Sequence, residues 1–136
     1  MTTLQRMRRL AAHRERLARL DLVEAENARA ATQSQVDEAS RQMTRALEHP
    51  CVDQEDHYLR HGFALRMETN RRAAERRLFE RQREVGARRE VLEAASREKG
   101  KFARLCELRE AAERAEIEAR DQRRLDEVGI LGWWRD

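Results

Sequence analysis

The chain has 136 residues, of which 40% are charged and 4% aromatic, and it contains a single proline. A wide globular core needs more aromatic and branched apolar residues, so this composition favours a long helix or a coiled coil. The net charge is only +3, because 29 basic residues are balanced by 26 acidic ones. Disorder is disfavoured, since the signs of the charges alternate and the apolar positions recur periodically.

The first predicted helix covers about residues 2–48. Thr2 and Gln5 form a capping box at its start. A small residue then recurs every seven positions, which keeps one narrow stripe facing a partner helix at an axial distance near 8 Å. The stripe consists of Ala11, Ala18, Ala25, Thr32, Ala39 and Ala46. Larger side chains flank it, on one side Leu10 and Leu17 and on the other Leu22, Val36 and Met43.

A bend is predicted over residues 49–53. Pro50 ends the first helix, because the residue before a proline is biased away from the helical conformation. Asp53 is suited to cap the second helix, with Asp56 in its first turn. In the alternative, Gly62 delays the second helix and the linker extends to residue 62.

The second predicted helix covers about residues 54–128. Gly129 is the predicted C-terminal cap, and residues 129–136 follow as an apolar tail. The apolar stripe of this helix reads Phe63, Met67, Ala74, Leu78, Val85, Leu92, Ala95, Lys99, Phe102 and Cys106. The sequence therefore predicts one all-α domain over residues 1–136, a long antiparallel two-helix coiled-coil hairpin.

The two predicted helices differ in length. With an early bend, the first helix pairs with the second only to about residue 103. The stripe then continues without a partner in the chain, which usually marks a contact surface. The residues of this continuation are Leu105, Leu108, Ala112, Ala115, Ala119, Leu125 and Val128. A later bend near Gly62, or self-association, are the alternatives.

No enzyme is expected from the motifs. The glycines are scattered rather than gathered in a phosphate-binding loop, and a two-helix rod offers no cleft for a nucleophile and its base. Neither a cofactor nor a catalytic residue is expected. Around the bend, a group of His and Cys residues lacks a second paired-ligand element, so no metal site is expected. This group is His49, Cys51, His57 and His61.

The sequence predicts a chain that is cytoplasmic or exported by a route other than the secretory one. No apolar run reaches the roughly 18 residues that a membrane helix needs, and no secretory signal opens the chain. Direct membrane insertion is therefore not expected. In a hairpin that bends near residue 50, Cys51 and Cys106 are too far apart for a disulfide, and we expect two free thiols.

Basic residues concentrate in two places. The run from Arg71 to Arg89 is interleaved with glutamates and contains one aromatic, Phe79, so a solvated face is favoured over nucleic-acid binding. The N-terminal cluster is less neutralised and suits an acidic protein surface. It comprises Arg6, Arg8, Arg9, Arg14, Arg16 and Arg19. Trp133 and Trp134 either fold back on the last turn or anchor in a partner.

The layout resembles the FliJ/YscO family, the stalk proteins of flagellar and virulence type III secretion systems. The resemblance rests on a first helix that opens with Leu4, Met7 and Leu10, the bend near Pro50, a Tyr58…Phe63 segment, and the closing run Gln122-x-x-Leu125-Asp126-Glu127. It implies an antiparallel coiled coil whose end with both termini inserts into a hexameric export ATPase. Such a protein promotes assembly of the ATPase and couples it to the membrane export gate, and secretion chaperones are further partners.

The resemblance also implies site residues. Phe63 and Met67 match the contact with the export gate, whereas Asn70 departs from the apolar pattern expected next. The tail anchor candidates, Trp133 and Trp134, have no counterpart in the family pattern. The candidates for facing the ATPase are Arg6, Arg8, Arg9, Arg16, Leu105, Leu108, Ala112 and Leu125. The alternatives are a generic structural coiled coil, a secretion-chaperone escort protein and, less favoured, a nucleic-acid-binding helical protein.

Overall fold

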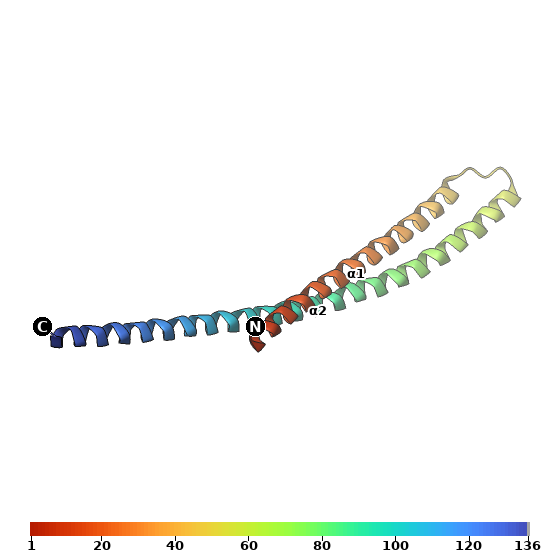
Figure 1. Cartoon of the computed structure of the whole chain (residues 1–136). Helices are drawn as coiled ribbons and strands as arrows, with labels where there is room; N and C mark the ends of the chain where they lie inside the picture. The colour runs from red at the N-terminus through yellow and green to blue at the C-terminus, as the bar shows by residue number, and fades with distance from the viewer. Residues whose placement is uncertain (136) are drawn as a thin grey trace. The chain divides into compact units, whose positions relative to one another are not determined.

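The structure, a computed structural model, describes residues 1–135. Two helices, α1 (Thr3–Glu48) and α2 (Gln54–Arg135), are joined by residues 49–53, and the described residues contain no strand (Figure 1). The helices pack against each other and run in opposite directions. The predicted all-α helical hairpin is confirmed, and its bend is the early one, because Gly62 lies inside α2.

The chain divides into two compact units. Unit 1 comprises Met1–Glu15 and Ala95–Asp136, and unit 2 comprises Arg16–Ala94. Each unit contains a part of α1 and a part of α2. A single domain over residues 1–136 stays a prediction.

Both helices begin at the predicted caps. The Gln5 N–H donates to Thr2 Oγ1 at 3.2 Å, and the Thr2 N–H donates to Gln5 Oε1 at 3.0 Å, which completes the capping box. At α2, the Asp56 N–H donates to Asp53 Oδ1 at 2.7 Å. Asp56 Oδ2 in turn accepts a hydrogen bond from the Val52 N–H at 3.1 Å. These bonds satisfy N–H groups that have no partner within the first turn of a helix.

The end of α2 differs from the prediction. Gly129 does not cap the helix, which continues as far as Arg135, and no described residue has a positive φ. Residues 129–135 of the predicted apolar tail are therefore part of α2. A glycine inside a helix costs only about 1 kcal/mol relative to alanine, and no proline follows Gly129 to stop the helix. Asp136, the last residue of the predicted tail, lies outside the described residues.

In unit 2, small side chains line the seam, the row of positions at which each helix faces the other. Ala18, Ala25 and Thr32 of α1 are buried, as the stripe predicts. The Thr32 hydroxyl donates to the Ala28 carbonyl at 3.0 Å, so a threonine fits the stripe without an unsatisfied polar group. The other buried residues of this unit's seam are Val36 of α1 and Ala64, Ala74 and Val85 of α2.

The structure also decides which flank of the stripe faces α2. Leu22 and Met43 are half-buried and Val36 is buried, whereas Leu10 and Leu17 are each 48% exposed. Spacings of four and three residues link Ala18, Leu22 and Ala25, which is the heptad arrangement of a coiled-coil seam. The side of Leu22 is therefore the inner one.

Candidate functional site

The paired part of unit 1 carries most of this unit's positive charge. We call residues 1–15 and 95–106 the basic segment, which contains eight Arg or Lys residues and two glutamates. Both glutamates already have cationic partners, because Glu15 lies 3.5 Å from Lys99 and Glu98 lies 3.8 Å from Arg14. The remaining cations make no ion pair within the described residues. They are Arg6, Arg8 and Arg9 of α1 and Arg97, Lys101 and Arg104 of α2.

The sequence identified only half of this basic segment. Arg6, Arg8 and Arg9 were predicted as candidates, and they are exposed. Because α1 and α2 are paired in unit 1, the cations of residues 97–104 belong to the same segment. Only the antiparallel pairing shows that the two groups of cations belong together, because it places the start of α1 against residues that follow it by about 100 positions. Cys106 Sγ, for example, lies 4.0 Å from the Leu4 carbonyl oxygen.

A buried carboxylate lies within the basic segment. Glu15 is 6% exposed and occupies the seam beside Ala11 of α1, which is 3% exposed. A buried charge at this position was not predicted from the sequence. The spacing contains the signal, however, since Glu15 comes four residues after Ala11 and three before Ala18, at the seam position that Leu22 holds one heptad later.

Cys106 is the last buried residue of α2, and beyond it Arg109, Glu110 and Glu113 line a surface depression with Leu4 and Gln5 of α1. The Cys106 thiol is buried, and every described residue from 107 to 135 is exposed, so we call residues 107–135 the exposed segment. The prediction that α2 extends beyond its pairing with α1 is therefore confirmed. Leu105, Leu108 and Leu125 are 39%, 53% and 66% exposed, and Ala112 is also exposed.

The seam does not continue as an apolar row along the exposed segment. The heptad spacing that ends in Phe102 and Cys106 continues at Arg109 and Glu113, which form an ion pair at 3.3 Å. Arg120 and Glu116 form another at 3.3 Å. Charges at these positions explain why the exposed segment does not require a second helix at the same face.

The predicted apolar stripe lies on a different face. Leu105, Leu108, Ala112, Ala115 and Ala119 share the spacing of the seam but are displaced from it by one residue, which is about 100° around the helix. Leu125 comes six residues after Ala119 and is turned about 120° from it. In ideal helix geometry Leu125 therefore lies off the face that Ala112, Ala115 and Ala119 share, and the continuation of the stripe through Leu125 and Val128 stays a prediction.

Two groups of candidates lie in unit 2. Arg16 is exposed there, and unit 1 contains the other ATPase-facing candidates. Of the export-gate candidates, Phe63 is 37% exposed and Met67 is half-buried in the seam. Both line a shallow surface depression with Asn70, the polar residue at which the family pattern is interrupted.

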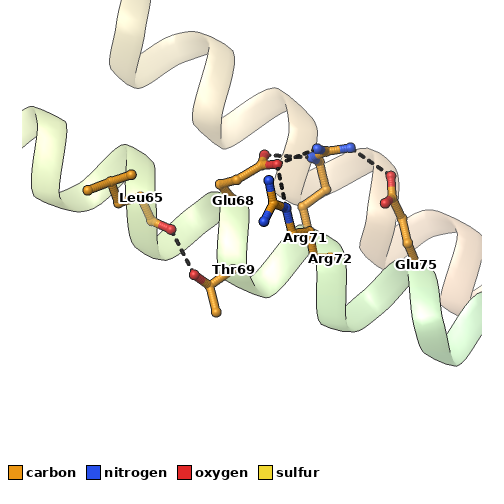
Figure 2. A network of polar contacts seen from close by, with 6 residues as sticks. All are labelled: Leu65, Glu68, Thr69, Arg71, Arg72 and Glu75. Atoms are coloured by element: carbon orange, nitrogen blue, oxygen red, sulfur yellow. Dashed lines mark hydrogen bonds and ion pairs between the residues drawn. The ribbon is translucent and has the colours of Figure 1, made fainter.

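A polar network follows Met67 along α2. Arg71 occupies a seam position and lies between Glu68 and Glu75, as Figure 2 shows. Its guanidinium donates to Glu68 at 2.5 and 2.9 Å and to Glu75 at 2.7 Å, and Arg72 Nε donates to Glu68 Oε1 at 3.1 Å. The hydrogen bond from Arg71 lowers the pKa of Glu68, and the same bond raises the pKa of Arg71.

His49, His57 and His61 and the exposed thiol of Cys51 lie in or next to the bend. Cys51 Sγ lies 3.8 Å from His57 Nδ1, and the Arg60 guanidinium donates to the His49 carbonyl and pairs with Asp56 at 2.9 Å. Within residues 1–135, no three His, Cys, Asp or Glu side chains are close enough to hold a metal ion. Over the same residues, neither helix contains an apolar stretch long enough to cross a membrane.

Comparison with known proteins found no matching family model, no similar curated protein and no similar solved structure.

Proposed function

We propose that this protein is a coiled-coil adaptor that binds another protein through unit 1. The observation that supports the proposal is the contrast within this unit. The basic segment is paired and has six cations that make no ion pair within the described residues, and α2 continues beyond it as a helix in which every described residue from 107 onward is exposed. A protein surface that is both basic and partly apolar is suited to bind a partner whose surface is acidic and also offers apolar contacts.

More specifically, we propose a non-enzymatic stalk protein of a type III secretion export apparatus. It binds and activates the hexameric export ATPase and links this ATPase to the export gate at the cytoplasmic face of the apparatus. The resemblance of its sequence layout to the FliJ/YscO family supports this proposal. In this view, the basic segment and the exposed segment meet the ATPase, and Phe63 and Met67 meet the gate.

The proposal is tested by mixing the full chain with the export ATPase of the same organism. We expect co-purification, a higher rate of ATP hydrolysis and a larger fraction of hexamer. Replacing Arg6, Arg8 and Arg9 by Glu is expected to slow association at least tenfold at low salt, because these cations steer the encounter. The matched control replaces Arg76, Arg77 and Arg83 of unit 2 by Glu. These arginines also make no ion pair among residues 1–135, and the control should leave the association rate unchanged.

The same measurements separate the rival functions. Absence of both binding and stimulation would remove the proposed function. A stable homodimer in light scattering, with no effect on the ATPase, would favour a generic structural coiled coil. Retention on RNA or DNA that falls steeply with salt would favour a nucleic-acid-binding protein.

A further inference from the structure

Unit 1 exposes apolar side chains in two places, and the first is the end of α2. Trp133 and Trp134 are 78% and 77% exposed, so the last helical turn does not cover them. Their rings contact each other edge to face, with centroids 6.2 Å apart. Neither the sizes nor the charges of the residues in this stretch indicate what covers the two rings. The second place is a row of five apolar side chains that begins at Leu105, and its sizes and charges do indicate an occupant.

We call this row the outer stripe, and it lies on a face of α2 that α1 leaves open. With Leu108 set at 0° and about 100° per residue, the row lies between about −20° and +60°. Phe102 and Cys106 of the seam lie near 120° and 160°. All five side chains of the row are exposed, Leu105 by 39% and Leu108 by 53%. The outer stripe consists of Leu105, Leu108, Ala112, Ala115 and Ala119.

The side chains of the outer stripe decrease in size along the helix, since two leucines come first and three alanines follow. Two copies that pair antiparallel, with residue 110 at their two-fold axis, place Leu108 of each copy against Ala112 of the other. The same alignment places Leu105 of each copy against Ala115 of the other. Each large side chain then meets a small one, which fills the space between the helices evenly. A parallel pair would place leucine against leucine and alanine against alanine.

The charges on this face also differ between its two ends. Three cations precede the outer stripe within about 40° of Leu108, and none of them makes an ion pair within residues 1–135. At the other end, Glu118 lies about 80° from Leu108, and it makes no ion pair in the same range either. The cations are Arg97, Lys101 and Arg104, and Arg104 lies on the same side of Leu108 as Glu118.

Antiparallel pairing brings these opposite charges together. With residue 110 at the axis, Arg104 of each copy lies beside Glu118 of the other, and the contact occurs twice, because a two-fold interface repeats each contact. In a parallel pair, the cations of both copies would lie at the same end and repel each other. On the opposite flank, Arg109 of each copy approaches the axis, where Glu113 of its own helix already pairs with it at 3.3 Å.

The area of this pairing indicates a weak dimer. Contacts from residue 97 to residue 123 extend over about 40 Å of helix, and a strip about 12 Å wide covers roughly 500 Å² on each copy. The total of about 1,000 Å² lies in the range of transient interfaces rather than of stable ones. We therefore expect a dissociation constant on the order of 100 μM, so the chain is monomeric at low micromolar concentrations.

We propose that the outer stripe is a self-association surface on which a second copy of this chain packs antiparallel. Leu105 and Leu108 pack over the alanines of the other copy, and the two reciprocal pairs of Arg104 with Glu118 determine direction and register. This inference goes beyond the proposed function and does not rest on it, because its test contains no ATPase. A protein that binds the exposed segment would displace the second copy.

The test measures the mass of the full chain by sedimentation equilibrium from about 5 μM to about 1 mM, under reducing conditions because Cys51 is an exposed thiol. We expect a monomer–dimer equilibrium. Leu108→Ala should weaken it at least fivefold, because both central contacts lose their large side chain. Ile117→Ala is the matched control and should dimerise like the wild type. Ile117 is 54% exposed, against 53% for Leu108, and lies on the opposite side of α2.

Charge reversal tests the antiparallel register. Arg104→Glu and Glu118→Arg should each weaken self-association at least fivefold, because like charges then meet twice. An equimolar mixture of these two variants should form a heterodimer, in which both pairs are again of opposite charge. Arg124→Glu is the matched control, since Arg124 is exposed, makes no ion pair within the described residues and lies about 160° from Leu108. It should dimerise like the wild type.

Three results would overturn this inference. The first is a chain that stays monomeric up to 1 mM, which would leave the outer stripe to a different protein. The second is a dimer that Leu108→Ala leaves as stable as that of the wild type. The third is a mixture of Arg104→Glu and Glu118→Arg that associates no more strongly than either variant alone. None of these results decides whether the chain binds the export ATPase, so the proposed function is tested separately.

Discussion

Single side chains in the seam of unit 2 have little room for change. Ala18 is 6% exposed and faces α2, so Ala18→Leu adds three carbon atoms where no space exists. We expect a loss of about 1–3 kcal/mol in the free energy of unfolding, measured by urea denaturation followed by circular dichroism. Leu17→Ala, at the exposed neighbouring position, is the control and should change stability by less than about 0.5 kcal/mol. Equal urea midpoints for Ala18→Leu and the wild type would contradict this packing.

The polar network of unit 2 predicts a dependence on pH. The pKa of Glu68 is lowered in the folded chain by the hydrogen bond from Arg71, so the unfolded chain binds a proton more readily. The resulting stabilisation is present above the ordinary pKa of 4.5 and is lost as the pH falls through the lower folded value.

The measurement compares urea midpoints at pH 6 and pH 3. Glu68→Gln should lower the midpoint at pH 6 and should lose less stability than the wild type on acidification. Glu24→Gln removes an exposed carboxylate that makes no ion pair within the described residues, and it should follow the wild type. An unchanged pH dependence in Glu68→Gln would show that the network contributes nothing to stability.

The residues of the seam were predictable to the extent that their spacing is regular. The small stripe was found because alanine recurs every seven positions, but the sequence analysis left its inner flank open, since leucines lie on both sides. The alternative heptad position would have placed Asp21, Gln35 and Gln42 in the seam. The structure does not use this more polar arrangement. Glu15 was missed because its residue type does not suggest burial, and its heptad position signals burial only once the inner flank of the stripe is known.

At the scale of helices, the start of α2 depends on one cap. Asp53→Ala removes the carboxylate that accepts the Asp56 N–H at 2.7 Å. We expect a loss of about 1 kcal/mol in the free energy of unfolding, whereas Asp53→Asn, which keeps an acceptor, should lose much less. Urea denaturation of both variants measures the difference. Equal losses would show that the charge of Asp53, rather than its hydrogen bond, stabilises the helix.

Helix starts were easier to predict than the end of α2. Caps at Thr2 and Asp53 act through side-chain bonds over three residues, so the sequence nearby determines them. Gly129 resembled a C-terminal cap, but such a cap also needs a left-handed conformation, which no described residue adopts. A glycine between Val128 and Ile130 is compatible with either outcome, and only the continuation of α2 to Arg135 decides between them.

At the scale of the molecule, the exposed segment was predictable and its orientation was not. The predicted lengths of the two helices indicate that α2 extends beyond α1. The structure confirms this, since α1 has 46 residues and α2 has 82. The face that its apolar residues occupy depends on accumulated turns of 100° per residue, so a shift of one position changes the face. The basic segment could not be predicted from a local pattern, because it forms only when two stretches that are distant in the sequence pair with each other.

The exposed segment is expected to be the least stable part of the described chain. Helices with little tertiary packing are marginal in water, and no residue from 107 to 135 is buried. In hydrogen exchange of the full chain, their amides should exchange at least a hundredfold faster than those of the seam around Ala18 and Val85. If this segment binds the export ATPase as proposed, addition of the ATPase should protect it and leave the seam of unit 2 unchanged. Slow exchange of residues 107–135 in the free chain would mean that another surface already covers them, and the exposed segment would then not be available for a partner.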